Sequence, residues 1–430
     1  MRKKKIYYPF FLRLTGAILF FTAVCLAFSK VAFSSFAVKA QFFPALDRKA
    51  WGVVVAVLIL TFLFGRFYCS VICPFGILQD IFSFVSRRKF SCDTNRFLLR
   101  YVIAAVSLSA FTAGSVFVIG WAEPYSNFGR IAAFIKNPAY LTGGIVLIGV
   151  LGLSVWKKRI FCTSICPVGT LLGLCAKVGL FKLHLSEKCI GCRKCVSVCP
   201  SGCVNPDKKE LDNERCVRCL KCASVCPVDA IGFKRAAVSS PAETDLSRRG
   251  FLTGSVTTAA AVGAGVVFGR RTSEAKKDEK RPIYPPGATT WQEFASKCTH
   301  CQLCVVNCKG KVLRSESKEY RTIHLEYGEN HCLYDCHRCS SLCPTGAIKP
   351  LSLKEKQNRR IGLAEFDTEK CVGCGLCADT CPKGAIQIND DEKTTLSAEK
   401  CIGCGACVEA CPLPEKAVHV VPVPVQTQIS

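Results

Sequence analysis

Methionine and histidine are scarce in this chain of 430 residues, since Met1 is the only methionine and there are six histidines. The histidines all lie outside the long apolar runs of the sequence: His184, His300, His324, His331, His337 and His419. A b-type haem held between membrane helices needs a pair of axial ligands, so the sequence excludes one. The haem-attachment motif C-x2-C-H is also absent, because Cys332-x3-Cys336-His337 has a different spacing.

Long apolar segments crowd the first third of the chain. Four of them, at about 14–29, 51–64, 98–121 and 140–156, are candidates for membrane spans, the first two only with their flanks. Lysines and arginines gather before the first segment, between the second and third, and after the fourth, whereas the loop between the third and fourth carries only Arg130 and Lys136. The positive-inside rule therefore predicts that both ends of this region face the cytoplasm of a bacterial inner membrane.

Most of the 32 cysteines stand in tight sets of four, which a disulfide framework does not need. Five sets have the spacing C-x2-C-x2-C-x3-C and one has C-x3-C-x2-C-x3-C, and proline follows the last cysteine of five sets. This spacing is typical of paired [4Fe–4S] sites, in which three cysteines of one set and the fourth of its partner hold each cubane. We expect the fourth cysteine to start a short helix. Zinc, the rival metal, commonly uses two C-x2-C pairs with a longer spacer and is disfavoured.

Interlocking of neighbouring sets assigns 24 iron ligands to six [4Fe–4S] clusters. The first unit uses Cys189, Cys192, Cys195 and Cys226 for one cluster and Cys216, Cys219, Cys222 and Cys199 for the other. The middle unit uses Cys298, Cys301, Cys304 and Cys343, then Cys332, Cys336, Cys339 and Cys308. The last unit uses Cys371, Cys374, Cys377 and Cys411, then Cys401, Cys404, Cys407 and Cys381. Cys203 is expected to be a small core residue, because alanine occupies the equivalent place in other sets.

Acidic residues are few, 32 against 57 lysines and arginines, which gives a formal charge of +25. Such an excess can indicate nucleic-acid binding, but the sequence carries no nucleic-acid-binding motif. Six cluster cores on 24 thiolates would lower the charge by roughly 12, to about +13. We therefore expect the excess to offset cluster charge and to set membrane topology, with no nucleic-acid partner.

A second cysteine pattern, Arg-x-aromatic-Cys-x3-Cys-Pro-x-Gly, occurs at 66–76 and again at 159–169. Cysteines four residues apart share one face of a helix, so the four thiols could converge near the first ferredoxin unit. We consider a redox, metal or quinone-site role, with Arg66 and Arg159 favouring thiolates. The candidates for it are Cys69, Cys73, Cys162 and Cys166. The alternative is a small buried apolar residue, which we expect for Cys25, Cys92 and Cys175.

Residues 245–252, which include Arg248 and Arg249, precede a weakly apolar run that ends at Phe268. This is the pattern of a twin-arginine export signal, here inside the chain. Because iron–sulfur clusters assemble in the cytoplasm, a cluster protein must cross the membrane folded, and twin-arginine transport carries folded cargo. We therefore expect the C-terminal units to be periplasmic. A chance arginine pair before a linker, or a retained anchor, is the alternative.

The predicted fold class is an α-helical membrane domain with four spans and a fifth candidate, joined to three α+β ferredoxin-like 2[4Fe–4S] units. The expected divisions are a membrane domain at 1–180, a cytoplasmic ferredoxin unit at 184–235, the signal-like segment at 245–271, an exposed linker at 272–290, and ferredoxin units at 291–350 and 365–423.

On these motifs, residues 1 to about 235 resemble the NapH-type membrane quinol dehydrogenase component, and residues from about 245 onward resemble the NapG/MauM-type exported four-cluster ferredoxin. The resemblance implies a conduit that oxidises menaquinol or ubiquinol and passes electrons to a periplasmic reductase or cytochrome, in a nitrate reductase-type system. No terminal substrate site of its own is visible. Two alternatives stay open: a maturation or assembly factor that reduces a metal or a cysteine for a respiratory enzyme, and a redox regulator.

Overall fold

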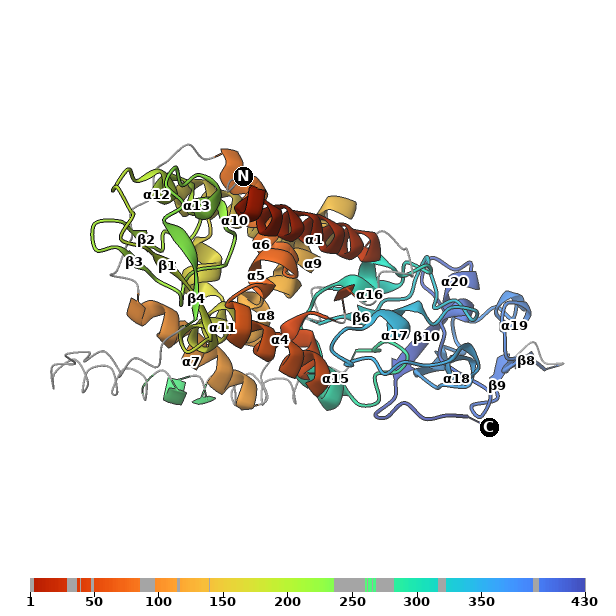
Figure 1. Ribbon diagram of the computed structural model, residues 1–430. Coiled ribbons are helices and arrows are strands. Elements are labelled where there is room, and N and C mark those ends of the chain that lie inside the picture. Colours follow the sequence, from red (N-terminus) through yellow and green to blue (C-terminus); the bar gives the residue numbers. More distant parts are fainter. Residues whose placement is uncertain are drawn as a thin grey trace. The chain divides into compact units, whose positions relative to one another are not determined.

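The computed structural model describes residues 4–28, 37–38, 40–47, 50–85, 97–113, 117–138, 140–235, 260, 262–264, 266–267, 282–315, 322–389 and 394–429 (Figure 1). The chain divides into two compact units. The first comprises Met1–Phe134 and Leu141–Glu274, and the second comprises Ile135–Tyr140 and Ala275–Ser430. The arginine pair of the predicted export signal lies outside the described residues, so the use of that signal stays a prediction.

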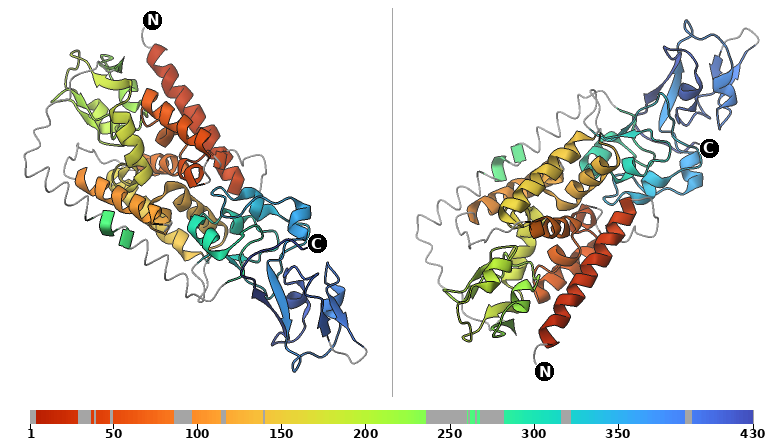
Figure 2. Two further views of the ribbon diagram at one scale, coloured as in Figure 1. Left: turned by 90° about the horizontal axis from the view of Figure 1, so that it is seen from below. Right: turned by 90° about the horizontal axis from the view of Figure 1, so that it is seen from above.

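The first unit begins with a helical region. Its helices are α1 (Lys4–Phe28), α3 (Phe42–Asp47), α4 (Trp51–Phe64), α5 (Tyr68–Val71), α6 (Pro74–Val85), α7 (Phe97–Thr112), α8 (Phe117–Ala122), α9 (Pro124–Lys136), α10 (Leu141–Lys157), the π-helical turn η2 (Phe161–Ile165) and α11 (Pro167–Lys177). Helix α1 packs on α5 and α6, α10 packs on α6, and α11 contacts both α4 and α7 (Figure 2). The two copies of the cysteine repeat therefore lie inside one helical bundle.

Helix length tests the predicted spans. Within the described residues, Pro9–Phe28 is one helix long and apolar enough to cross a membrane, and the pair Pro124–Lys136 and Leu141–Trp156, bent by 116°, passes only if it counts as one span. Helix α4 has 14 residues, about 21 Å at 1.5 Å per residue against a hydrocarbon core of about 30 Å. The third predicted span is split between α7 and α8. Four spans therefore stay a prediction.

Large apolar side chains nevertheless point outward from several of these helices. Leu19 on α1 is 72% exposed, Trp51 on α4 is 60% exposed, and Ile148 on α10 is 74% exposed. Scattered exposed apolar residues are normal, but rows of them along helices are typical of surfaces that contact something other than water.

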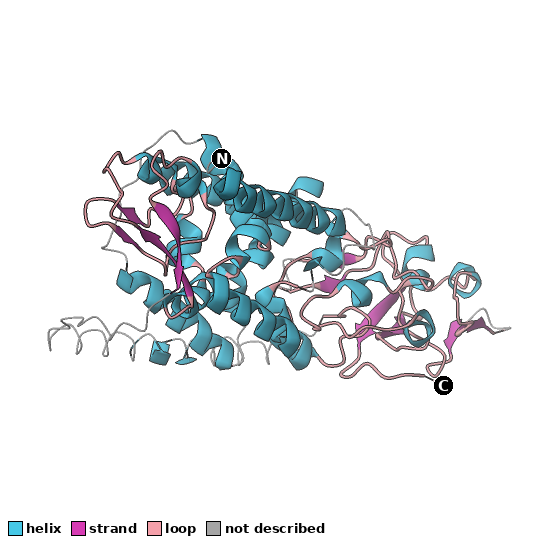
Figure 3. Ribbon diagram, viewed as in Figure 1, coloured by secondary structure: helices cyan, strands magenta, loops and turns pink. Residues whose placement is uncertain are grey.

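The first ferredoxin unit follows α11 and is built from short paired strands (Figure 3). Strand β1 (Phe181–Leu185) pairs antiparallel with β4 (Ile231–Arg235), and β2 (Val204–Asn205) pairs with β3 (Glu210–Leu211). Two helices, α12 (Lys194–Val198) and α13 (Lys221–Ser224), pack on one another. A small core of Leu183, Ile231 and cysteine side chains lies between them.

The second unit repeats this plan in its last part. Strand β7 (Gly362–Phe366) pairs antiparallel with β10 (Val418–Pro422), and β8 (Ile386–Ile388) pairs with β9 (Thr394–Leu396). The middle part has the inner pair β5 (Leu313–Arg314) and β6 (His324–Leu325). Its helices are α15 (Trp291–Lys297), α16 (Leu303–Val306), α17 (Arg338–Leu342) and α18 (Leu353–Gln357), and those of the last part are α19 (Leu376–Asp379) and α20 (Ala406–Ala410).

The short helices start earlier than the sequence suggested. The helix within each of the six cysteine sets contains the third cysteine and ends before the fourth, so the expectation that the fourth cysteine starts the helix is wrong. The residue before the helix is left-handed in most sets, with φ of 55° at Arg193 and 81° at Gly405. The proline after the fourth cysteine disfavours the α conformation in that cysteine. Cys199 and Cys411 are accordingly extended, with ψ of 115° and 121°.

The described end of the predicted linker is also different from expectation, because residues 282–288 are buried. The Tyr284 ring is stacked near Phe294, and its hydroxyl donates to the Val423 and Pro424 carbonyl oxygens at 3.0 Å. The Gln426 amide donates to the Tyr284 carbonyl at 3.0 Å. This segment is therefore part of the folded second unit, and an exposed linker cannot extend as far as residue 290.

Candidate functional site

Three cavities in the ferredoxin units are lined by cysteines of two different sets. The first lies in unit one, and the other two lie in unit two. Their cysteines are Cys199, Cys216, Cys219 and Cys222 in the first; Cys371, Cys374, Cys377 and Cys411 in the second; and Cys381, Cys401, Cys404 and Cys407 in the third. Each cavity thus brings three cysteines of one set to the fourth of its partner, which is the grouping that interlocking predicts.

The middle ferredoxin shows the same grouping through its thiol electrostatics. Burial raises the pKa of Cys304 well above its usual value, and Cys301, Cys298 and Cys343 raise it further. Burial likewise raises the pKa of Cys339, with added contributions from Cys332, Cys308 and Cys336. The thiols of both predicted groups of four therefore lie within electrostatic range of one another, despite the longer Cys332–Cys336 spacing, and the assignment of each cysteine to a cluster stays a prediction. In the first unit, Cys189 and Cys192 lie beside Cys195.

Backbone amides point at the fourth cysteines of three sets. The Ala230 N–H donates to Cys226 Sγ at 3.2 Å, and the Ala385 N–H donates to Cys381 Sγ at 3.3 Å. In the middle ferredoxin the Ile348 N–H donates to Cys343 Sγ at 3.4 Å. Hydrogen bonds to cysteine sulfur favour the anionic thiolate that iron binds.

Cys203 is buried in the core, as expected for a small apolar residue, but its thiol also contacts predicted ligands. Its Sγ lies 3.5 Å from Cys199 Sγ. Hydrogen bonds to Cys199 and Cys216, with burial, raise the pKa of Cys203 well above its usual value. The raised pKa favours the protonated Cys203 thiol, whose S–H is placed to donate to Cys199 Sγ.

The middle and last ferredoxins meet at their cysteine loops. The Cys332 N–H donates to the Cys404 carbonyl oxygen at 2.9 Å, and the Tyr327 hydroxyl donates to the Gly403 carbonyl oxygen at 2.8 Å. Lys356, which is 2% exposed, adds a positive charge near Cys332. One predicted cluster site of each ferredoxin thus adjoins the other within the second unit.

The four cysteines of the repeat come together in the first unit, all buried at 3–5% exposure. The arginine of each copy contacts the other copy. Arg66 of the first copy donates to the Cys162 carbonyl oxygen at 2.8 Å, and Arg159 of the second copy donates to the Cys69 carbonyl oxygen at 2.9 Å. Both arginines are fully buried. Each copy therefore holds the first cysteine of the other in place. The rings of Phe75 and Phe161 pack edge to face between the copies, with centroids 4.8 Å apart.

The glycine of each copy permits a close approach of the chain. A Cβ on Gly76 would lie 2.5 Å from the Cys69 carbonyl oxygen, and a Cβ on Gly169 would lie 2.5 Å from the Cys162 carbonyl oxygen. Helices α6 and α11 begin at the prolines that follow Cys73 and Cys166, where proline suits the first helical position. Both helix N-termini are thus placed at cysteine sulfurs.

Each of the four sulfurs has an N–H donor. Gln79 Nε2 donates to Cys162 Sγ at 3.3 Å, and the Gly169 N–H donates to Cys166 Sγ at 3.2 Å. Arg66 Nη2 lies 3.8 Å from Cys69 Sγ. At Cys73 burial raises the thiol pKa, and a backbone hydrogen bond from Gly76 opposes that rise.

Burial has a larger effect on the pKa of these thiols than the arginines have. It raises the pKa of Cys162 to about 11, although Arg159 and Arg66 lower it. Burial also raises the pKa of Cys166 well above its usual value. The arginines lower the thiol pKa of Cys162, as expected, but by too little to make it a free thiolate.

Asp80 connects this centre to the ferredoxin. Its carboxylate accepts from Arg159 Nε at 2.7 Å and Nη2 at 2.8 Å, and from Arg13 Nη2 at 3.2 Å. Arg159 is also within electrostatic range of Cys219, and its backbone N–H donates to the Pro200 carbonyl oxygen at 3.2 Å. The centre therefore adjoins the cavity lined by Cys199 and Cys219.

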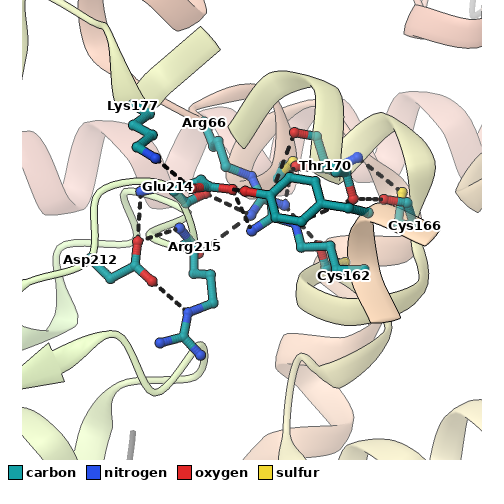
Figure 4. A network of polar contacts seen from close by, with 12 residues as sticks. Arg66, Cys162, Cys166, Thr170, Lys177, Asp212, Glu214 and Arg215 are labelled. Atoms are coloured by element: carbon teal, nitrogen blue, oxygen red, sulfur yellow. Dashed lines mark hydrogen bonds and ion pairs between the residues drawn. The ribbon is translucent and has the colours of Figure 1, made fainter. Parts of the chain in front are cut away.

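The turn at Glu214 makes a second contact between the four-cysteine centre and the first ferredoxin unit (Figure 4). The Asp212 carboxylate accepts from the Glu214 and Arg215 N–H groups at 2.9 and 3.2 Å, which shapes a tight turn. The carbonyl oxygens of Glu214 and Arg215 accept from Arg66 Nη1 at 3.2 and 3.4 Å. The Glu214 carboxylate pairs with Arg100 at 3.2 Å, and both side chains are buried.

The sequence did not single out Gln79, Asp80, Arg13 or Glu214. Positions 172 and 173, which correspond to Gln79 and Asp80 in the second copy, are leucine and glycine, so comparison of the copies could not find them. Within the described residues, no three His, Cys, Asp or Glu side chains lie close enough to hold a single metal ion.

Comparison with protein families finds iron–sulfur domains along most of the cysteine-bearing sequence. A profile described as a 4Fe-4S binding domain matches residues 52–92 and 140–186. Profiles described as 4Fe-4S dicluster domains match residues 188–230 and 297–347, and residues 363–412. The chain therefore contains 4Fe–4S ferredoxin domains in both halves, whereas the resemblance of the C-terminal half to the NapG/MauM type is not shown by these matches.

Comparison with curated proteins finds ferredoxin-type relatives. The ferredoxin-type protein NapH of Escherichia coli K12 is 26% identical over 155 residues, 35% of this chain. NapH of Haemophilus influenzae is 24% identical over 153 residues, also 35% of this chain. The methylamine utilization ferredoxin-type protein MauN of Methylorubrum extorquens is 30% identical over 156 residues, 34% of this chain. The chain spans 52% of the length of each of these relatives. No solved structure matches.

Proposed function

We propose that this chain is a membrane-bound iron–sulfur protein that takes electrons from quinol and passes them to a periplasmic respiratory reductase or cytochrome. Six [4Fe–4S] clusters on the predicted 24 cysteines would carry the electrons, and the protein would have no terminal substrate site of its own. The first ferredoxin unit would lie in the cytoplasm, and the clusters of residues 298–411 would lie in the periplasm.

The observation that carries this proposal is the direct contact between the four-cysteine centre of the helical region and a ferredoxin cavity. Arg159 braces Cys69, pairs with Asp80 and reaches the loop after Cys199 through its backbone N–H. Such contacts hold two redox-capable sites at a fixed separation within one folded unit. They suit a protein that moves electrons between the membrane region and the ferredoxin.

Membrane attachment is supported by the apolar surfaces of the helical region. Helix α1 is long and apolar enough to span, and its outward residues include Ile18 and Leu19. Helices α4 and α10 also expose large apolar side chains. In a four-span arrangement these faces would contact lipid, and the flanking lysines and arginines would remain in the cytoplasm.

Burial of the four cysteines counts against a maturation factor. A thiol that reduces an external metal or a partner's cysteine must be reached by that group, whereas Cys73 and Cys166 are 3% and 4% exposed. We therefore favour electron transfer over a maturation role.

The test is anaerobic reduction of the purified full chain by menaquinol in detergent or nanodiscs, followed by EPR spectroscopy. We expect the clusters of the first ferredoxin unit to be reduced, with oxidised menaquinone as the negative control. Cys199→Ser should lose one of these signals and keep the other. Clusters that are reduced by dithionite but not by ubiquinol or menaquinol would overturn the quinol-donor proposal.

A further inference from the structure

The four-cysteine centre of the helical region has the features of a cofactor site. We infer that Cys69, Cys73, Cys162 and Cys166 together hold an iron–sulfur cluster of their own, in addition to the six ferredoxin clusters. The inference holds whichever donor and acceptor the protein uses.

The first argument is the hydrogen bonding of the sulfurs. At Cys166 the Gly169 N–H donates at 3.2 Å, and at Cys162 the Gln79 amide donates at 3.3 Å. The same donor type and distance occur at Cys226 and Cys381 in the ferredoxins. N–H donors aimed at cysteine sulfur stabilise a metal-bound thiolate. The four-cysteine centre is thus prepared in the same way as the ferredoxin sites.

The second argument is an unmatched positive charge. Arg66 is fully buried, and its hydrogen-bond partners are the carbonyl oxygens of Cys162, Glu214 and Arg215 and the sulfur of Cys69. Among the described residues no carboxylate pairs with it. A buried guanidinium without a counter-ion is strongly unfavourable. An anionic group at the four sulfurs would supply the missing charge.

The size of the missing negative charge follows from the charged side chains around the four-cysteine centre. Four buried arginines surround the centre, namely Arg13, Arg66, Arg100 and Arg159. Two carboxylates, Asp80 and Glu214, pair with three of them. Among these four arginines and two carboxylates the excess is two positive charges, since the exposed Lys177 beside Glu214 is solvated, and the N-termini of α6 and α11 add favourable dipoles for an anion. A core of charge +2 on four thiolates carries about −2, which matches.

Iron–sulfur chemistry fits better than a single ion. The described residues contain no group of three ligands tight enough for one ion, and this holds equally for the ferredoxin sets. In an iron–sulfur cluster the four cysteine sulfurs bind four different irons, or bind in pairs to two irons. The sulfurs therefore stand farther apart than four sulfurs around a single zinc ion. The matched 4Fe-4S profile over residues 52–92 and 140–186 contains the four cysteines and none of the ferredoxin sets.

The experiment compares anaerobically purified full chains: wild type, Cys73→Ser, Cys166→Ser and the control Cys175→Ser. Cys175 lies on α11 as well, but its thiol faces the Leu58 carbonyl oxygen at 3.7 Å, away from the centre. Iron, zinc and acid-labile sulfide are measured per chain, and native mass spectrometry weighs the bound inorganic content. EPR of the six ferredoxin clusters reports that each variant has folded.

We expect Cys73→Ser and Cys166→Ser each to lose or alter the iron and sulfide of one cluster beyond the roughly 24 irons of the ferredoxins. One spectroscopic signal should disappear or shift while the ferredoxin signals remain, and Cys175→Ser should match wild type. Unchanged iron, sulfide and spectra in both variants would overturn the inference. Stoichiometric zinc, or a disulfide between these cysteines in the wild type, would overturn it as well.

Discussion

The buried ion pair between Asp80 and Arg159 gives a prediction whose size follows from the structure. Asp80→Asn keeps the shape of the side chain and removes its charge. Burial alone would raise the pKa of Asp80, but the positive charges of Arg159, Lys221 and Arg13 together outweigh burial and hold it well below its usual range, so the native carboxylate is charged. Arg159 is fully buried, and Arg13 is 6% exposed. The variant therefore leaves two buried guanidinium groups without their carboxylate.

Breaking a buried pair from one side costs about 3–5 kcal/mol. At low protease concentration, cleavage follows the population of the opened state, so cleavage within the helical region should accelerate roughly 100- to 4,000-fold. The assay is limited proteolysis of the full chain in detergent micelles, with fragments of unit one identified by mass spectrometry.

The matched control is Asp207→Asn. Asp207 pairs with Arg193 at 2.8 Å, but both side chains are more than 60% exposed. We expect no measurable change in cleavage rate for this variant, because water solvates either partner when the pair is broken. If Asp80→Asn cleaves at a rate close to that of Asp207→Asn, the reasoning from burial and charge is refuted.

Three further predictions concern packing, redox tuning and export. Gly169→Ala should destabilise the helical region by about 1–3 kcal/mol, because the added Cβ overpacks against the Cys162 carbonyl oxygen. Gly152→Ala, whose Cβ meets open space, should not destabilise it. Thermal unfolding in detergent measures both variants. Cys203→Ala should lower the midpoint potential of the adjoining cluster, since the S–H directed at Cys199 stabilises the more negative reduced state; an EPR titration with an unchanged potential would contradict this. Replacing the arginine pair 248–249 by lysines should silence a periplasm-only reporter fused after residue 430, while the same change at 270–271 should leave it active; a reporter already silent in the wild type would place the C-terminal units in the cytoplasm.

The cysteine groupings could be predicted from the sequence because cluster ligation fixes the spacing of the ligands locally. Cys381 joins Cys401, Cys404 and Cys407 in one cavity, as interlocking requires. The helix positions were harder, since the effect of Pro200 on Cys199 depends on a backbone rule that cysteine spacing does not express. The left-handed residue before most of these helices, such as Arg193, is likewise not evident from residue type.

The four-cysteine centre was only partly predictable. The repeat indicated that four thiols converge, but the stabilising contacts use main-chain oxygens about 90 residues away, as from Arg159 to Cys69. Main-chain acceptors leave no trace in residue identity. Asp80 has no counterpart in the second copy, so Arg159 pairs with a carboxylate whereas Arg66 contacts carbonyl oxygens and the Cys69 sulfur, an asymmetry that only the structure reveals.

The reciprocal bracing by Arg66 and Arg159 has a consequence for how such a fold can be divided. One copy of the repeat supplies two sulfurs and an arginine whose acceptor belongs to the other copy. A shortened chain with a single copy would have to pair with a second molecule, in a two-fold arrangement, to present the same four sulfurs. Substitutions in either copy are thus constrained by the other, and the two halves of the helical region can change only together.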